Sequence, residues 1–371
     1  MRVLLLSSFF YPHYGGSERY MEELYVSLIK ANSTIATDVV CYNTDQAVDK
    51  EKYRGLNIYR VPCWVILPGQ FALPNPVALI LLIKRLSSQY KYDIVHSNTR
   101  FFDHSWYAPL VAKALGAKSV LTDHCANHPL AKLKLVTAIS GVFDRFSLAI
   151  CSQSYDMVIA TNKATQKFLR KYSFKSPQLI YGGVDSNYFK PGIKKPLTIT
   201  FVGRMIKSKG PQVLLEVAKK ITTKYPQAHF VFAGGGELFN KLSADADKHI
   251  QFTGPLSSKE VAKLLSQTDI FVHPSIHPEG FPNVILEAGS CGCAVIATDQ
   301  GGTKEIIINN KTGLLVEPTV DSLLIAIEKL ILDQTLKSKL AKALQVKIRQ
   351  DFDWKKIAQQ FQQLIKTELN S

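Results

Sequence analysis

The feature that most constrains this chain is a repeated alternation of short apolar runs with longer amphipathic patterns. Short apolar runs bounded by polar, Gly or Pro residues predict buried strands, and apolar residues three and four positions apart predict helices. In the first half, the predicted strands are Val3–Ser7, Thr37–Tyr42, Ile58–Val61, Ile94–Ser97, Ser119–Thr122 and Met157–Ala160. The predicted helices between and after them are Ser17–Lys30, Val77–Tyr90, Trp106–Leu115 and a segment ending at Lys171. This order predicts an α/β fold with a parallel, doubly wound sheet.

The same alternation starts again in the second half, with a strand at Leu197–Val202 and a helix at Pro211–Tyr225. A chain of 371 residues is also long enough for two domains. We therefore predict two Rossmann-like domains that face each other across a cleft, covering residues 1–188 and 189–353. The segment Tyr188–Pro196 is the predicted linker because it is rich in Pro and Gly. Residues 354–371 contain an amphipathic helix that we expect to pack back on the first domain.

The net charge of +15 is shared by both halves: residues 1–190 carry 22 Lys and Arg against 13 Asp and Glu, and the rest carry 23 against 17. Such a field favours anionic partners, namely nucleotide phosphates, acidic lipids or nucleic acid, without choosing among them. No basic helix with interleaved aromatic residues predicts nucleic-acid binding. The six cysteines contain no C-x-x-C pair and indicate reduced thiols in the cytoplasm. The first apolar run is interpreted as a buried strand rather than a signal peptide.

The most informative segment covers residues 273–289 and reads HPSIHPEGFPNVILEAG. It predicts a strand end, a loop with Glu279 and a helix with Pro282 in its first turn, where a missing N–H costs nothing. The free amides near Asn283 and the helix dipole would form an anion site. Glu287 follows about two helical turns after Glu279, so one carboxylate can accept hydrogen bonds from ribose and the other from a sugar. The alternative is a capped helix with one solvated acid.

Two further loops follow predicted strands of the second half. After Val202 the sequence is GRMIKSKG, in which Arg204 and Lys209 can pair with a diphosphate, Arg through its planar fork and Lys as a point charge. After the strand that ends at Ala233, a Gly-rich turn around Gly235 permits close approach to a ligand, although a plain turn explains it equally well. This turn is not a Walker A loop, because it lacks the Gly-Lys-Ser/Thr ending of that motif.

Three other loops are candidates for the same site. Gly15 and Gly16 follow the first strand, where backbone amides can approach phosphate at the start of a helix. His124 follows the strand that ends near Thr122 and is interpreted as a binding-site histidine, as a structural histidine, or as a metal ligand together with His128. The loop at residues 299–305 is either a structural turn or part of the phosphate site.

Together these residues resemble the retaining glycosyltransferases of family 4, glycosyl transferases group 1, which have the GT-B fold. The most specific element is the Glu279-x7-Glu287 pattern with Gly-Phe-Pro-Asn inside it. The resemblance implies that Arg204 and Lys209 bind the donor diphosphate, that Glu287 binds ribose, and that His124 and Glu279 act at the reacting sugar. It also implies a donor-binding set comprising Gly15, Gly16, Gly235, Gly280, Phe281, Pro282 and Asn283. It further implies a nucleotide-sugar donor, no cofactor and no catalytic metal.

The acceptor is less well defined by the sequence. The resemblance implies that the first domain binds it, and the basic charge with apolar Trp64–Ile66, Val77–Ile83 and Lys132–Val142 favours an anionic membrane surface. Core helices with solvated lysines explain the same pattern. We therefore expect a cytoplasmic enzyme, peripheral on the membrane, that transfers a hexose from a UDP- or GDP-sugar to a lipid-linked or polysaccharide acceptor. A sugar-nucleotide epimerase is one alternative, and a catalytically silent nucleotide-sugar-binding subunit is the other.

Overall fold

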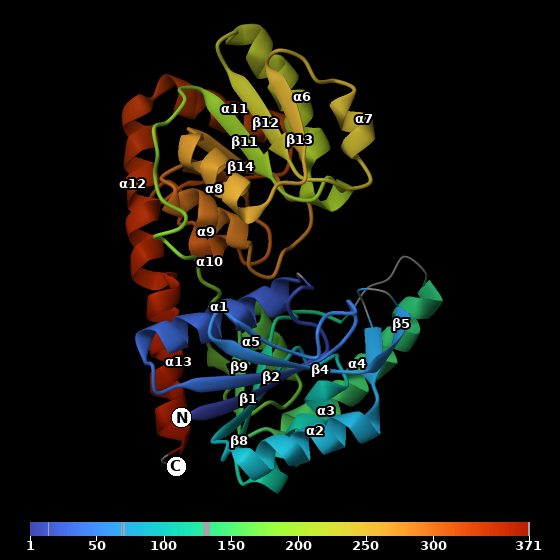
Figure 1. Ribbon diagram of the computed structural model, residues 1–371. Coiled ribbons are helices and arrows are strands. Elements are labelled where there is room, and N and C mark those ends of the chain that lie inside the picture. Colours follow the sequence, from blue (N-terminus) through green and yellow to red (C-terminus); the bar gives the residue numbers. More distant parts are fainter. Residues whose placement is uncertain (14, 68, 70, 129–133, 370–371) are drawn as a thin grey trace. The chain divides into compact units, whose positions relative to one another are not determined.

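The computed structural model describes residues 1–13, 15–67, 69, 71–128 and 134–369. The chain forms two compact units (Figure 1): the first contains Met1–Tyr181 and the chain from Trp354 onward, and the second contains Gly182–Asp353. The boundary therefore lies between 181 and 182 rather than between the predicted 188 and 189. No helix of the described residues is both long and apolar enough to cross a bilayer.

The first unit is built on a sheet with the strand order β10-β9-β8-β7-β1-β2-β4-β3. All neighbouring strands are parallel except β3 and β4, which are antiparallel. The strands are β1 (Arg2–Ser7), β2 (Ala36–Tyr42), β3 (Lys50–Tyr53), β4 (Leu56–Val61), β7 (Ile94–Asn98), β8 (Lys118–Asp123), β9 (Met157–Ala160) and β10 (Gln178–Leu179). A separate antiparallel hairpin consists of β5 (Cys63–Leu67) and β6 (Phe71–Pro74).

Alternate residues of these strands enter two different cores. Val3 and Leu5 of β1 pack with the helices α1 (Gly16–Ala31) and α13 (Trp354–Leu369), whereas Leu4 and Leu6 pack with α2 (Pro76–Gln89) and α3 (His104–Leu115). A strand with both faces buried reads as a continuous apolar run, which is why the sequence at 3–6 shows no alternation. The unit also contains α4 (Lys134–Ser154) and α5 (Lys163–Lys171).

The second unit has an entirely parallel sheet with the order β13-β12-β11-β14-β15-β16. Its strands are β11 (Thr198–Val202), β12 (His229–Ala233), β13 (Ile250–Gly254), β14 (Ile270–His273), β15 (Ala294–Thr298) and β16 (Leu314–Val316). Its helices are α6 (Pro211–Lys224), α7 (Phe239–Ser243), α8 (Ser258–Gln267), α9 (Asn283–Ser290), α10 (Thr303–Ile306), α11 (Val320–Leu332) and α12 (Gln334–Asp351), with a 3-10 turn η1 (Lys207–Lys209). Helices α6 and α11 share the core on one face of the sheet.

The predicted linker is part of the second unit. The Phe189 side chain is 3% exposed, Gly192 N–H donates to the Ser266 carbonyl at 3.2 Å, and Lys195 N–H donates to the Gln267 carbonyl at 2.8 Å. Pro and Gly mark irregular backbone, but they do not show whether that backbone is packed. Here an apolar anchor and backbone hydrogen bonds fix the segment against α8.

Most predicted strands and helices are present with ends shifted by one or two residues. The sequence prediction omitted α4, the hairpin β5–β6, the edge strands β3, β10 and β13, and the helices α7 and α12. The residues that precede α4 are outside the described part of the chain, so the predicted apolar segment Lys132–Val142 falls partly beyond it.

Candidate functional site

The second sheet has its topological switch point between β11 and β14. The chain runs from β11 outward to β12 and β13, and then returns to β14 on the other side of β11. In open α/β sheets, the helices diverge at this point and ligands bind beside the carboxyl ends of the two strands. The predicted residues Arg204 and Glu279 lie in the loops that follow β11 and β14, so the fold brings two separate motifs to one position.

Glu279 lies between two basic side chains. Lys209 Nζ pairs with its Oε2 atom, and His273 Nε2 lies 2.9 Å from Oε1. Burial by itself would raise the pKa of this carboxyl group, but His273 and Lys209 together lower the pKa to about 2. Glu279 is therefore an anion at neutral pH, suited to accept hydrogen bonds from hydroxyl groups and unsuited to donate a proton.

The backbone of η1 holds this arrangement together. The Ser208 carbonyl oxygen accepts hydrogen bonds from Ile276 N–H at 2.8 Å and from Ser275 Oγ at 3.2 Å. Ser275 is in turn fixed by Thr298 Oγ1, which donates to its carbonyl at 2.5 Å. The loop after β14 is thereby joined to η1 and to the end of β15. This explains why Lys209, seventy residues away in sequence, reaches Glu279.

Arg204 and Lys209 differ in their surroundings, although the sequence predicts the same diphosphate-binding role for both. Arg204 is exposed, and its guanidinium makes no hydrogen bond or ion pair with the residues that the structure describes. Lys209 is already paired with Glu279. A free guanidinium beside a switch point is the more available group for an anionic ligand, because it gives up no existing ion pair on binding.

The glycines around the site permit close contact between loops. A Cβ atom at Gly301 would overlap the backbone of Glu279, and a Cβ at Gly302 would overlap the Gly280 carbonyl oxygen. Gly302 N–H also donates to the Glu279 carbonyl at 2.9 Å. Of the two interpretations of residues 299–305, the structure therefore supports a packing role: this turn supports the backbone that carries Glu279 and Gly280.

The Gly-rich turn after β12 also contains glycines that permit close contact with a neighbouring loop. A Cβ atom at Gly234, which has φ +134°, would overlap the Gly203 carbonyl oxygen. The Gly235 carbonyl accepts a hydrogen bond from Met205 N–H at 2.8 Å. The turn therefore packs against the loop that carries Arg204. This contact accounts for the glycines without a ligand, although it leaves the predicted donor contact of Gly235 untested.

Helix α9 begins at Asn283, one residue later than predicted, with Pro282 as the preceding cap residue. The Pro282 side chain makes no cap hydrogen bond, but its carbonyl accepts one from Ile285 N–H at 3.0 Å. Phe281 packs against Phe352, with ring centroids 5.7 Å apart. Glu287 lies in the middle of α9 and is 8% exposed. The role of this segment in donor binding stays a prediction.

In the first unit, Gly15 and Gly16 stand at the start of α1 as predicted, with Gly15 as the cap residue. The sequence interpretation overlooked Glu18, which is buried and whose carboxylate lies against Gly15, where an added Cβ would overlap it. An acidic side chain in the first turn complements the helix dipole. A phosphate at this turn, as predicted, would therefore lie close to a carboxylate.

His124 follows β8 and packs edge-on against Tyr20, with ring centroids 4.9 Å apart; Tyr20 in turn packs against Trp354 at 5.4 Å. Its Nε2 atom is buried and has no hydrogen-bond partner among the described residues. Burial lowers the pKa of His124 to about 4, so the ring is neutral at pH 7. A neutral imidazole can donate or accept one hydrogen bond at this nitrogen.

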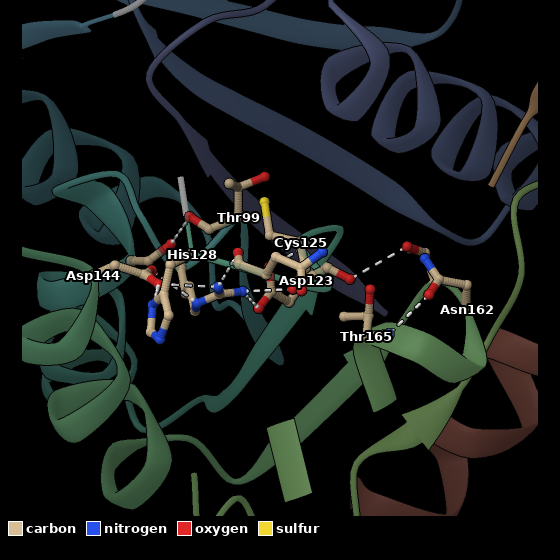
Figure 2. A network of polar contacts seen from close by, with 11 residues as sticks. Thr99, Asp123, Cys125, His128, Asp144, Asn162 and Thr165 are labelled. Atoms are coloured by element: carbon tan, nitrogen blue, oxygen red, sulfur yellow. Dashed lines mark hydrogen bonds and ion pairs between the residues drawn. The ribbon is translucent and has the colours of Figure 1, made fainter. Parts of the chain in front are cut away.

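The metal-ligand interpretation of His124 with His128 is not supported by the geometry. Both ring nitrogens of His128 are engaged: Nδ1 lies 2.5 Å from Asp144 Oδ2 (Figure 2), and Nε2 lies 2.7 Å from the Tyr172 hydroxyl. Within the described ranges, no group of three or more His, Cys, Asp or Glu side chains is placed to hold a metal ion.

The sequence analysis also missed two residues, His273 beside Glu279 in the second unit and Arg100 beside the His124 loop in the first. His273 is the last residue of β14 and its position at a strand end was a usable signal. Arg100, which is 1% exposed, pairs with Asp123 and Asp144 on the two sides of the His124 loop. A buried arginine has no local signature, because its partners are distant in sequence.

The comparisons with known proteins identify the family of the chain. The family model described as Glycosyltransferase Family 4 matches residues 14–188, and the model described as Glycosyl transferases group 1 matches residues 184–347. The phosphatidylinositol N-acetylglucosaminyltransferase GPI3 subunit of Saccharomyces cerevisiae is 24% identical over 374 residues, covering 96% of this chain and 80% of that protein.

Solved structures give the same fold. The crystal structure of Anabaena Alr3699/HepE in complex with UDP has a TM-score of 0.75 at 18% identity and covers 99% of this chain and 100% of that one. Sucrose-phosphate synthase from Thermosynechococcus elongatus has a TM-score of 0.74 at 22% identity, covering 99% and 98%. Both likenesses concern the fold, while the two family models together cover most of the chain. The chain belongs to the family 4, group 1 glycosyltransferases, which have the GT-B fold of two Rossmann-like domains.

Proposed function

We propose that this glycosyltransferase moves a hexose from a UDP-sugar to a hydroxyl group of a lipid-linked acceptor, with retention of the anomeric configuration. The observation that carries the proposal is the switch point of the second unit, where the unpaired Arg204 guanidinium and a Glu279 that is ionised at neutral pH lie in the loops after β11 and β14. A cation for the diphosphate and an anion for sugar hydroxyls are the two groups that a nucleotide-sugar donor requires. The choice of UDP is supported by the similar fold of Alr3699/HepE, which was crystallised with UDP.

The proposed reaction exchanges one bond at the anomeric carbon for another. The bond from this carbon to the diphosphate oxygen breaks, and its electron pair leaves with UDP. The acceptor oxygen forms the new bond on the same face, and its proton passes to the departing phosphate oxygen. Arg204 stabilises the negative charge that develops on the diphosphate, which is a typical means of lowering the barrier of group transfer. No metal or cofactor takes part in the proposed reaction.

We propose for the predicted residues the roles that the family resemblance implies. Lys209 assists Arg204 and fixes Glu279, while Glu279 and the backbone of Gly280–Asn283 bind the donor sugar. Glu287 binds ribose, and Gly235 completes the phosphate side. His124, neutral and with an unpartnered Nε2 atom, is proposed to hydrogen-bond the reacting sugar. Gly15 and Gly16 are proposed to approach the phosphates.

Calorimetry with UDP-, GDP- and ADP-sugars tests the donor site. We expect one nucleotide class to bind, and Arg204→Ala to weaken that binding by roughly 10- to 100-fold, as a lost charged hydrogen bond predicts. Lys219→Ala is the matched control, since Lys219 lies on α6 and its ion pair with Asp245 is exposed. Equal binding by wild type and Arg204→Ala would contradict the assignment. Product NMR that shows an inverted anomeric centre would contradict retention.

We propose an acceptor at an anionic membrane surface on the cytoplasmic side. The support is the hairpin β5–β6, in which Trp64, Ile66 and Leu67 are more than half exposed, and the adjacent helix α2. On α2 the exposed stripe begins with the apolar Val77, Ile80 and Leu81 and continues with the basic Lys84 and Arg85. An apolar patch edged by cations is typical of proteins that bind the membrane interface.

Vesicle flotation tests the membrane proposal. The wild-type protein should float with vesicles that contain anionic lipid at low salt, and a Trp64→Asp, Ile80→Asp double variant should stay in solution while it still binds the donor. Absence of wild-type flotation at low salt would overturn the membrane proposal and leave the donor assignment intact.

An epimerase of the same fold remains the second candidate, since a nucleotide-sugar site serves both reactions. Incubation of the UDP-sugar without acceptor distinguishes them: an epimerase interconverts the sugar, whereas a transferase leaves it intact apart from slow hydrolysis.

A further inference from the structure

Polar atoms without partners gather at one edge of the first unit's sheet. They are the side-chain amide nitrogen and oxygen of Asn98, Thr99 Oγ1, His124 Nε2, the Asn162 amide nitrogen and Thr165 Oγ1. Asn98, Thr99, Asn162 and Thr165 are all more than nine-tenths buried. Buried polar atoms are normally paired, because each unpaired one costs free energy. A group of them in one place therefore calls for an explanation.

These residues follow three neighbouring strands. Asn98 ends β7, His124 follows β8, and Asn162 comes two residues after β9. The pairing continues beyond the strands: Thr99 N–H donates to the Thr122 carbonyl at 2.8 Å, and Thr161 N–H donates to the Asp123 carbonyl at 3.2 Å. The unpaired atoms thus line the carboxyl edge of β7, β8 and β9. β7 adjoins β1 at the switch point of this sheet.

The backbone is strained at the same place. Thr99 has φ +64°, a left-handed conformation that is unfavourable for a β-branched residue. Strained backbone persists where surrounding structure enforces it, and it is concentrated at binding sites. Two hydrogen bonds hold Thr99 in this conformation. Its N–H donates to the Thr122 carbonyl, and its own carbonyl accepts from Ser105 Oγ at 3.1 Å.

The charged groups beside this edge are already neutralised by one another. Arg100 uses all five of its N–H donors, toward Asp123, the carbonyls of Cys125 and Asn127, and both oxygens of Asp144. Figure 2 shows part of this network, with His128 on Asp144 at one side and Asn162 with Thr165 at the other. An arginine with no free donor cannot bind a phosphate, so the network leaves neutral hydrogen-bonding atoms for a ligand.

We infer that the edge formed by Asn98, Thr99, Asn162 and Thr165 is a subsite for the neutral, hydroxylated ring of a sugar or cyclitol. A hydroxyl group both donates and accepts, and therefore matches the paired donor and acceptor of the Asn98 amide. The inference rests on the proposed function, in which this ring is the part of the acceptor that carries the reacting hydroxyl. Any phosphate or lipid portion of the acceptor is bound elsewhere.

Ligand-observed NMR with wild-type protein and free myo-inositol, glucose or glucose 6-phosphate tests the subsite. We expect at least one neutral ring to bind in the millimolar range, and Asn98→Leu to weaken its binding at least tenfold. UDP binding measured on the same samples should not change. Because the Asn98 amide has no partner to lose, the midpoint of thermal unfolding should stay the same or rise in Asn98→Leu.

Asn43→Leu is the matched control. Its amide, in the same unit, is fully paired, with Nδ2 to the Ala47 carbonyl at 2.8 Å and Oδ1 to Ala47 N–H at 2.9 Å. We expect this variant to lower the thermal midpoint and to leave ring binding unchanged.

Three outcomes would overturn the inference: binding of no neutral ring by wild-type protein that binds UDP, ring binding that survives Asn98→Leu, or tighter binding of glucose 6-phosphate than of glucose. A lower thermal midpoint for Asn98→Leu with unchanged ring binding would show that buried water pairs with the amide instead. Failure of the wild-type protein to bind any nucleotide sugar would instead remove the proposed function.

Discussion

The carboxyl edges of the two sheets carry different kinds of polar side chain, although both sheets have a switch point beside their first strand. At the edge of the second unit, the charged side chains point to an anionic ligand, since Arg204 is free and Lys209 and His273 together hold Glu279 ionised. At the edge of the first unit, Arg100 is buried and fully paired, and the atoms left without partners are neutral. The difference lies in whether the arginine is exposed or buried.

This contrast teaches how one fold can be used for two kinds of ligand. An exposed cation keeps its charge available to a diphosphate, whereas a buried cation must be matched by acids and becomes part of the scaffold. Neutral polar atoms then provide recognition of hydroxyl groups. The net charge is positive in both halves of the chain, so it does not show that one edge has a free cation and the other has only neutral atoms without partners.

The largest expected effect is a difference between the two units in how their folding stability depends on pH. Burial lowers the pKa of His96 to about 3 and that of His104 and His124 to about 4, from 6.5. An unfolded chain binds these protons first, so the first unit loses stability as pH falls from about 6.5 to about 4, by about 1.4 kcal/mol per unit of pKa shift. The folded pKa of Glu279 is instead depressed below 4.5, so its contribution is complete above pH 4.5 and is lost only toward pH 2.

Urea unfolding from pH 7 to pH 4, followed by amide exchange in each unit, measures this difference. The first unit should lose protection before the second does. Equal loss in both units would show that the three histidines do not control acid stability, and titration of His96 above pH 5 by NMR would contradict its assigned burial.

The second prediction compares the two arginines. Arg100→Met removes the cation that pairs with two buried carboxylates and should lower the free energy of unfolding by about 3–5 kcal/mol. Arg204→Met should change it by less than about 0.5 kcal/mol, because Arg204 is exposed and has no ion pair with the described residues. Chemical denaturation of both variants is the measurement. Similar losses would erase the proposed contrast.

The third prediction compares two glycines at helix starts. Gly302→Ala places a Cβ on the Gly280 carbonyl oxygen and should cost about 1–3 kcal/mol and weaken donor binding. Gly16→Ala meets no atom within 4 Å and should leave stability unchanged or raise it by up to about 1 kcal/mol. Thermal unfolding and UDP calorimetry check both. Weaker UDP binding by a stable Gly16→Ala variant would support the phosphate role of that turn.

The smallest effect concerns the strain at Thr99. Thr99→Gly removes both the unfavourable φ of +64° and an unpaired hydroxyl, and should raise the free energy of unfolding by roughly 1 kcal/mol. Thr99→Ser keeps the hydroxyl and should bind the neutral ring as well as wild type. Destabilisation by Thr99→Gly would show that packing of the Thr methyl group outweighs the strain.

Much of the fold and part of the site could be predicted from the sequence. The strand at 3–7 was correctly identified because a strand buried on both faces is a continuous apolar run. The edge strands β3 and β10 were missed because each is short and only partly buried, so hydrophobicity gives little signal. The linker was placed too late because Pro and Gly in residues 188–196 mark irregular backbone, not a domain boundary.

By itself, the sequence determined the α/β class, the alternation of strands and helices and the family, since these depend on local periodicity and on motifs contiguous in the chain. Only the tertiary structure decided that Lys209 is paired with Glu279 while the Arg204 side chain is free, that Gly301 and Gly302 support the Glu279 loop, and that the Asn98 side-chain amide has no partner. These properties depend on which distant residues meet when the sheets form. Periodicity records how deeply a residue is buried, but it does not record what lies against it.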